Sequence, residues 1–130
     1  MSGDRRMEEV PTNVLCAERC QLGEGPTYDA ATDTAWWFDI VGRRLFEAKL
    51  GTGQTTIHSL EVMGSAFGRI DAHRQLVVAD DGLYVRELSN GRMTLYRPLE
   101  ADNAATRSND ARVHPSGTFW IGTMGLFSIF

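Results

Sequence analysis

The sequence predicts an all-β chain of antiparallel β-propeller blades, with about two and a half blades in an incomplete ring. Three observations predict this fold class. Strand-type runs follow one another through tight turns, a period of 42 to 43 residues relates three segments, and no long helical pattern interrupts them. Repeats of about 40 to 45 residues with several strands each are typical of propeller blades. A meander or a sandwich with regularly spaced turns is the competing interpretation.

The expected strands are recognised by β-branched and aromatic residues or by alternation, with hairpin-type turns between them. In the first segment they cover residues 34–42, 43–50 and 52–60, with a Gly-Thr-Gly turn at 51–53. In the second they cover residues 74–80, 83–88 and 92–98, with turns at 81–82 and 89–91. The third segment supplies residues 117–125. Residues 98–110 are expected to form a loop that holds a short helical turn.

The repeat is anchored on turn residues that precede a strongly apolar strand in each segment. Asp71 follows Asp29 by 42 residues, and His114 follows Asp71 by 43. Propeller rings close with about four to eight blades, so two blades and the opening strands of a third make only part of a ring. We therefore expect an N-terminal tail at 1–12 and a partial propeller at 13–130 that is truncated in its third blade. Self-association through the exposed blade edges is a further expectation.

Charge and hydropathy exclude several classes of partner. The chain has 13 Lys and Arg against 17 Asp and Glu, a net charge of -4, and no basic block that would neutralise phosphates, so no nucleic acid is expected. No apolar run approaches the roughly 18 residues of a membrane helix, so no membrane contact is expected. The N-terminus lacks the apolar region of a secretory signal. Together these features predict a cytoplasmic protein.

The cysteines, histidines and tryptophans carry no metal or nucleophile pattern. Cys16 and Cys20 would lie about 13 Å apart on one face of a strand, whereas a disulfide needs Cα atoms within about 7 Å. They are interpreted as reduced thiols, as in a reducing compartment. The histidines lie on different segments and are interpreted as surface or turn residues, and the tryptophans as residues that pack within blades.

Glu24 stands between two glycines in the stretch Gln21 to Asp29, QLGEGPTYD. Small neighbours allow the backbone to approach a ligand closely, and Pro26 stiffens the following residue. A dinucleotide fingerprint would need a third glycine and a following helix, which the sequence lacks. Two interpretations stay open on this motif: a solvated turn acid, or one oxygen ligand for a divalent cation such as Ca²⁺ or Mg²⁺.

Arg107, Asn109 and Asp110 are gathered within four residues, just before an expected blade strand. Arginine offers a rigid fork of donors, and asparagine offers both an acceptor and a donor, so the pair suits a ligand rich in hydroxyl groups. The alternative is an Asx-type turn beside a surface arginine. Glu24 and this group are expected to lie just upstream of the innermost strands of their blades, near the central channel.

LGEGPTYD, AWWFDI, LVVADDGLY and TRSNDARVHPSGTFWIGTMG together resemble the gluconolactonase and regucalcin (senescence marker protein) family of six-bladed propellers. The resemblance spans about Leu22 to Gly125 and implies a metal-dependent hydrolase that opens sugar lactones. It implies one divalent cation, Ca²⁺ or Zn²⁺, with Glu24 as a metal ligand. It also implies that Arg107 and Asn109 contact the hydroxyl groups of the sugar lactone, while Asp110 supports the loop.

The chain departs from the family pattern in what it lacks. The further metal ligands of the family, an Asn and an Asp that is also its base, lie in later blades, and no acidic residue follows the GTM motif here. No catalytic residue is therefore assigned. We expect an N-terminal part of a lactone hydrolase that is inactive alone. The alternative is a non-catalytic calcium-binding or self-associating propeller module.

Overall fold

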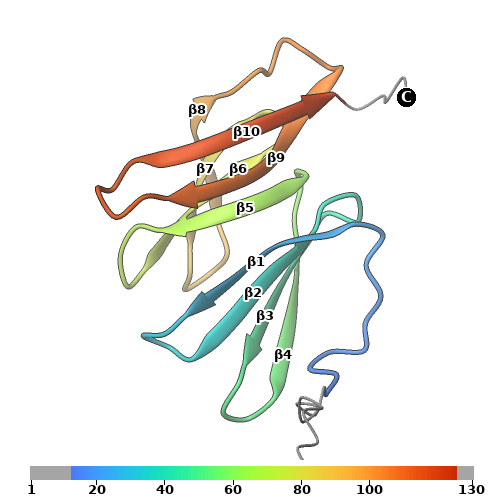
Figure 1. Ribbon diagram of the computed structural model, residues 1–130, viewed down its shortest axis with the longest axis vertical. Helices are drawn as coiled ribbons and strands as arrows, with labels where there is room; N and C mark the ends of the chain where they lie inside the picture. The colour runs from blue at the N-terminus through green and yellow to red at the C-terminus, as the bar shows by residue number, and fades with distance from the viewer. Residues whose placement is uncertain (1–12, 126–130) are drawn as a thin grey trace, which may run out of the picture.

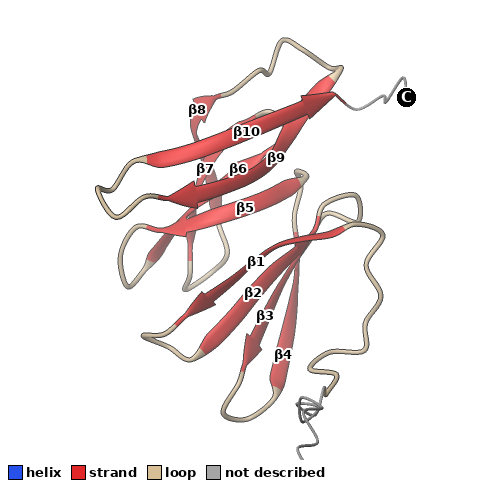
Figure 2. Ribbon diagram, in the orientation of Figure 1, coloured by secondary structure: helices blue, strands red, loops and turns tan. Residues whose placement is uncertain are grey.

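The computed structural model describes residues 13–125 and, within this range, contains ten β-strands and no helix (Figures 1 and 2). The strands are β1 (Gly23–Asp29), β2 (Thr34–Asp39), β3 (Arg44–Lys49), β4 (Gln54–Ser59), β5 (Gly64–Arg69), β6 (Arg74–Ala79), β7 (Gly82–Glu87), β8 (Met93–Pro98), β9 (Thr106–Val113) and β10 (Phe119–Gly125). The expected tail at 1–12 and the last residues, 126–130, lie outside the described part. Among the described residues, nothing has the length and hydropathy of a membrane-spanning helix.

The strands form three antiparallel sheets in which sequence neighbours are also spatial neighbours. β1 to β4 make the first sheet, β5 to β8 the second, and β9 and β10 a two-stranded third. The first strands of the three sheets lie side by side, with β5 between β1 and β9 (Figure 1). This arrangement confirms the prediction of propeller blades in an incomplete ring: two full blades and the opening hairpin of a third.

The repeat predicted from the turn residues has a structural counterpart in each sheet. The side chains of Asp29, Asp71 and His114 each accept a hydrogen bond from the backbone N–H two residues further on, at 3.0, 2.8 and 3.1 Å. Each of these residues stands at the start of the turn that connects the first strand of its blade to the second. The same local turn therefore recurs at the 42- and 43-residue spacing, which confirms the period.

The first strand of each sheet was not predicted. The expected helical turn within residues 98–110 is wrong, because strand β9 begins at Thr106 and no helix occurs in the described range. The sequences of β1, β5 and β9 are GEGPTYD, GSAFGR and TRSNDARV. These strands carry glycine and small polar residues and lack the alternation of a strand with one apolar and one solvated face. Sequence periodicity therefore gives no strand signal for them.

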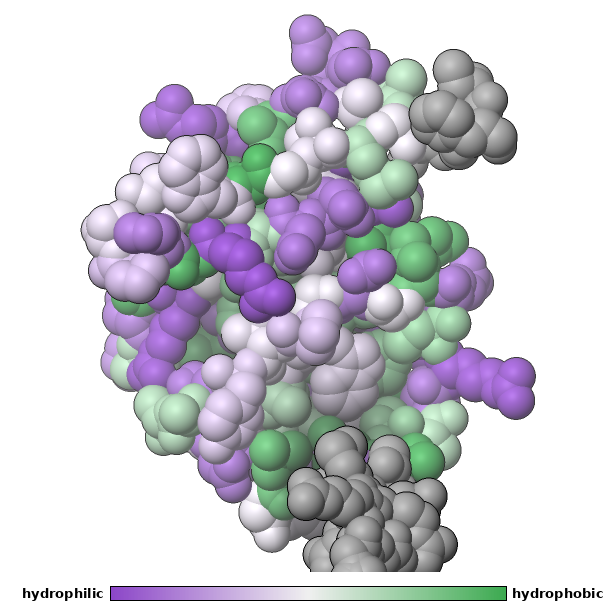
Figure 3. Space-filling model, in the orientation of Figure 1, coloured by the Kyte–Doolittle hydropathy of each residue, from purple (hydrophilic) through white to green (hydrophobic). Residues whose placement is uncertain are grey.

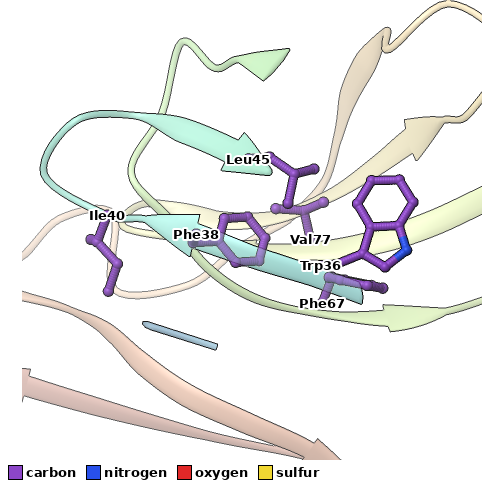
Figure 4. Packing of buried hydrophobic residues seen from close by; sticks show 6 residues of the cluster. All are labelled: Trp36, Phe38, Ile40, Leu45, Phe67 and Val77. Atoms are coloured by element: carbon purple, nitrogen blue, oxygen red, sulfur yellow. The ribbon is translucent and has the colours of Figure 1, made fainter. Parts of the chain in front are cut away.

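The hydrophobic core joins the first two sheets (Figure 4). Its buried members come from β2, β3, β5 and β6 and from the residue after β2: Trp36, Phe38, Leu45, Phe67, Val77 and Ile40. Phe38 meets Phe67 edge-on, with ring centroids 6.2 Å apart and planes at 62°. Burial of these large apolar side chains between the two blades is the main contribution to the free energy that holds the sheets together.

Asp39 anchors the entry to the first blade. Its buried carboxylate accepts four hydrogen bonds, from the backbone N–H of Gln21, Leu22 and Gly42 at 3.0–3.1 Å and from Nη2 of Arg44 at 3.0 Å. Burial alone would raise the pKa of Asp39, but these hydrogen bonds outweigh that effect and hold its pKa below its usual value. In the second blade, Asp80 accepts a hydrogen bond from the backbone N–H of Met63. Met63 and Asp80 are 17 residues apart, as are Leu22 and Asp39 in the first blade.

Asp39→Asn is expected to destabilise the chain at pH 7 by about 1–3 kcal/mol, because the neutral amide cannot replace the hydrogen bonds of a charged acceptor. A lowered native pKa adds stability above the unfolded value, near about 3.9, and this stability is lost as pH falls through the native value. The difference from the parent chain should therefore shrink below about pH 4. Urea unfolding followed by circular dichroism at pH 7 and below about pH 4 measures this difference in the free energy of unfolding. Asp102→Asn, at an exposed site, is the control. A difference that stays constant with pH would contradict the role given to this carboxylate.

The described chain leaves several strand edges open, and one of them belongs to β10 in the third sheet. β10 pairs with β9 alone, and within residues 13–125 its second edge has no strand partner. Trp120 on this strand is 68% exposed, so the expectation that it packs within a blade is wrong for the described chain, whereas Trp36 is buried as expected. Hydrophobic side chains on the face shown in Figure 3 lie in separate groups between hydrophilic ones. They do not mark a single continuous docking patch on that face.

Candidate functional site

Each of the three inner strands is irregular. The pairing register shifts between Glu24 and Thr27 in β1, between Gly64 and Ala66 in β5, and opposite Ile121 and Thr123 in β9. Such bulges add a residue to one strand, re-aim its side chains and are common next to active sites. The predicted site residues lie on two of these three strands.

Glu24 is the second residue of β1 and pairs across the sheet with Phe38. It lies within the innermost strand and not upstream of it as expected, because the innermost strand of this blade is β1 and not the apolar strand β2. Its side chain is exposed, and its carboxylate accepts no hydrogen bond from a described residue. Within residues 13–125 the carboxylate therefore has no hydrogen-bonding partner, and its exposed side chain is accessible to a ligand.

Gly25 allows β1 to approach β5 closely. Its φ is +64°, a left-handed conformation that favours glycine, and a Cβ atom at this position would collide with the carbonyl oxygen of Ser65. The small residue beside Glu24, first noted for ligand access, thus also serves packing between two blades.

A buried hydroxyl pair joins β5 to β9. The Oγ atoms of Ser65 and Ser108 are 2.7 Å apart, and Ser108 Oγ also donates to the carbonyl of Ala79 at 2.9 Å. Both serines are almost fully buried. Because Ser65 also packs against Gly25, the pair links the neighbourhood of Glu24 to Arg107 and Asn109, which flank Ser108.

Arg107 and Asn109 lie within β9, again in the innermost strand and not before it. The Arg107 side chain is buried, and its Nη1 donates to the carbonyl of Ser108 at 2.9 Å, which leaves its other guanidinium donors for a ligand. Asn109 is half-buried. Asp110 is exposed and accepts the N–H of Ala111 at 2.8 Å, a local bond that fits the expected role in ordering the backbone.

The described residues fit only part of a cation site. A carboxylate is the hard oxygen donor that Ca²⁺ and other divalent cations take. Within residues 13–125, however, no group of three or more His, Cys, Asp or Glu could hold a metal ion. Glu24 can therefore fill one coordination position, and the chain described here does not build a complete metal site.

Sequence reasoning missed Ser65 and Ser108. Ser108 stands inside the RSND motif but offers no charge or metal ligand to attract notice. Ser65 is the second residue of β5, as Glu24 is of β1 and Arg107 is of β9. If each repeat had been extended toward the N-terminus by one strand, Ser65 would have aligned with Glu24 and Arg107. The sequence of β5 lacks alternation, so this strand was not recognised.

The fold and the inner-strand residues define a partial β-propeller with a candidate ligand site on its first strands. The sequence profile of the SMP-30/Gluconolactonase/LRE-like region matches residues 22–129. A putative sugar lactone lactonase of Rhizobium meliloti (strain 1021) is 49% identical over 105 residues, which are 81% of this chain and 35% of that protein. The chain belongs to the SMP-30/gluconolactonase/LRE-like family.

Solved structures support the same fold. The crystal structure of a calcium-binding protein, regucalcin, from Agrobacterium tumefaciens matches with a TM-score of 0.85 and 50% identity over 87% of this chain and 38% of that one. A gluconolactonase from Xanthomonas campestris matches with a TM-score of 0.59 at 23% identity, a likeness of fold alone. The chain thus spans little more than a third of the length of these relatives.

Proposed function

We propose that this chain is part of a cytoplasmic sugar-lactone hydrolase that uses one divalent cation, Ca²⁺ or Zn²⁺. The observation that carries the proposal is the placement of Glu24, Arg107 and Asn109 on inner strands that Ser65 and Ser108 join. The family membership and the lactonase relative support the substrate class. The free thiols of Cys16 and Cys20 suit a reducing compartment.

The residues of this chain would bind and orient. Glu24 would fill one coordination position of the cation, which when bound polarises a carbonyl and activates water. Arg107, already held by the Ser108 carbonyl, would donate to substrate hydroxyls with little loss of conformational freedom. Asn109 would add one donor and one acceptor. The remaining coordination would come from groups outside the described residues.

Calcium titration by calorimetry tests the role of Glu24. The parent chain is expected to bind Ca²⁺ weakly, because one carboxylate supplies little of the coordination. Glu24→Gln should abolish this binding, and Glu61→Gln, at an exposed carboxylate outside the inner strands, should leave it unchanged. Equal binding by all three chains would remove Glu24 from the site.

A lactone-hydrolysis assay tests the expected lack of activity. The 130-residue chain should not hydrolyse D-glucono-1,5-lactone above the background rate with Ca²⁺ or Zn²⁺.

A calcium-binding or self-associating module is the second candidate. The regucalcin of Agrobacterium tumefaciens, described as calcium-binding, supports the first role, and the open edge of β10 supports the second. Light scattering separates the two: a monodisperse dimer or trimer favours assembly, whereas a monomer that binds Ca²⁺ favours the binding module.

A further inference from the structure

A cleft lies at the opposite ends of the inner strands from Glu24 and Arg107. Its volume is about 520 Å³, and it opens between the first two sheets, where β1, β5 and β9 end. Its lining includes the last residues of these strands, from Thr27 to Asp29 and from Ala111 to Val113. None of the three predicted site residues lines it. Its volume falls within the range of about 300–1,000 Å³ that is usual for small-molecule sites.

The floor of the cleft is aromatic. Trp36 and Phe67 line it and meet edge-on, with ring centroids 5.6 Å apart and planes at 75°. Both rings are held in the core between the first two sheets, so the floor is rigid. Trp36 is 5% and Phe67 7% exposed, so the two rings offer a flat apolar group a small but preformed contact area.

Gln75 brings an unpartnered donor to this floor. Its side chain is only 3% exposed, and its Oε1 accepts a hydrogen bond from Nη1 of buried Arg86 at 3.2 Å. This bond orients the amide, so that its –NH₂ group points away from Arg86, and no described residue accepts from that group. A ligand in the cleft could accept a hydrogen bond from this group.

The charges around the cleft leave a positive excess. Three basic side chains, Lys49, Arg69 and Arg112, and two acidic ones, Asp29 and Glu47, line it. Arg69 pairs with Asp29 at 3.1 Å, and Lys49 with Glu47 at 3.6 Å. His58 also contacts Glu47, at 2.9 Å. Arg112 has no acidic partner among the described residues, so the free charge is a guanidinium, in a chain whose net charge is -4.

We propose that this cleft binds a small aromatic carboxylate. Its ring would lie on Trp36 and Phe67, its carboxylate would pair with Arg112, and the Gln75 amide would donate to one of its oxygen atoms. Arginine and carboxylate groups match each other in geometry as well as in charge. The site is independent of Glu24 and does not rest on the proposed hydrolase function.

Titration of the full chain with sodium benzoate, followed by ¹H–¹⁵N NMR, tests the proposal. Saturable shifts are expected at the indole N–H of Trp36 and at the side-chain amide of Gln75. Benzamide, which keeps the ring without the charge, and acetate, which keeps the charge without the ring, should each bind more weakly. Arg112→Gln should weaken benzoate binding by about twofold to fivefold, the effect of losing an exposed ion pair. Arg92→Gln, at an exposed arginine outside the cleft, is the matched control.

Three results would overturn the proposal: no saturable shift at Trp36 or Gln75, equal affinity for benzamide and benzoate, or equal affinity of the Arg112 and Arg92 variants. Glu24→Gln should bind benzoate like the parent chain. A loss of calcium binding in that variant with benzoate binding retained shows that the two sites are separate. Loss of both in Glu24→Gln would contradict that independence.

Discussion

Gly25→Ala is expected to lower the free energy of unfolding by about 3 kcal/mol or more. A left-handed backbone costs a residue with a Cβ about 1–2 kcal/mol, and forcing an extra methyl group against packed atoms costs about 1–3 kcal/mol. At Gly25 both costs apply, because φ is +64° and the new Cβ would collide with the Ser65 carbonyl. The obstacle is backbone, so it can yield only if β1 moves away from β5. Urea unfolding monitored by circular dichroism measures the loss.

Gly53→Ala is the matched control for this prediction. Gly53 has a φ of +73°, but nothing lies within 4 Å of the position that its Cβ would take. This variant should therefore show only the conformational cost, about 1–2 kcal/mol. The difference between the two variants isolates the contact between β1 and β5. Equal losses would mean that the inner strands are not in close contact at Gly25.

Phe38→Ala is expected to cost about 3–5 kcal/mol, the usual range for truncating a buried aromatic ring. Phe38 is fully buried between the first two sheets and meets Phe67 edge-on. Its ring also fills the space over Gly64, where a Cβ would come within 2.7 Å of it. Removing it leaves a cavity against β5 that glycine cannot fill. The same unfolding experiment measures the loss.

Trp120→Ala provides the comparison for Phe38→Ala. This larger ring is 68% exposed on β10, so its removal should change stability by no more than about 0.5 kcal/mol. A loss as large as that of Phe38→Ala would show that Trp120 is buried in solution. Self-association through the edge of β10 would be one way to bury it, and light scattering on the same samples would detect that.

The outer strands of both full blades could be predicted because each carries its own signal. β2 holds Trp36 and Phe38 on one face, and β6 is a run of β-branched and apolar residues. Turns of the Asp-Gly and Asn-Gly type separate such strands in the second blade. Alternation and turn chemistry act over a few residues, so they can be recognised without any knowledge of the fold.

The inner strands could not be predicted in this way. Gly25 accommodates close approach to another blade, Ser65 and Ser108 bond to each other across 43 residues, and each strand is bulged. Their residues are selected by contacts with neighbouring blades and not by a local pattern of burial. Such contacts have no signature in a window of ten residues, and for this reason β9 was expected to be a loop.

By itself, the sequence determined the fold class, the blade period and the site motifs around Glu24, Arg107 and Asn109, because turn chemistry, alternation and short motifs are local. Only the tertiary structure decided that these residues lie within inner strands, and that Ser65 and Ser108 join those strands. It alone also revealed the cleft above Trp36 and Gln75 between the first two sheets. These features arise where separate blades meet, and the distance between blades is set by packing that no single segment encodes.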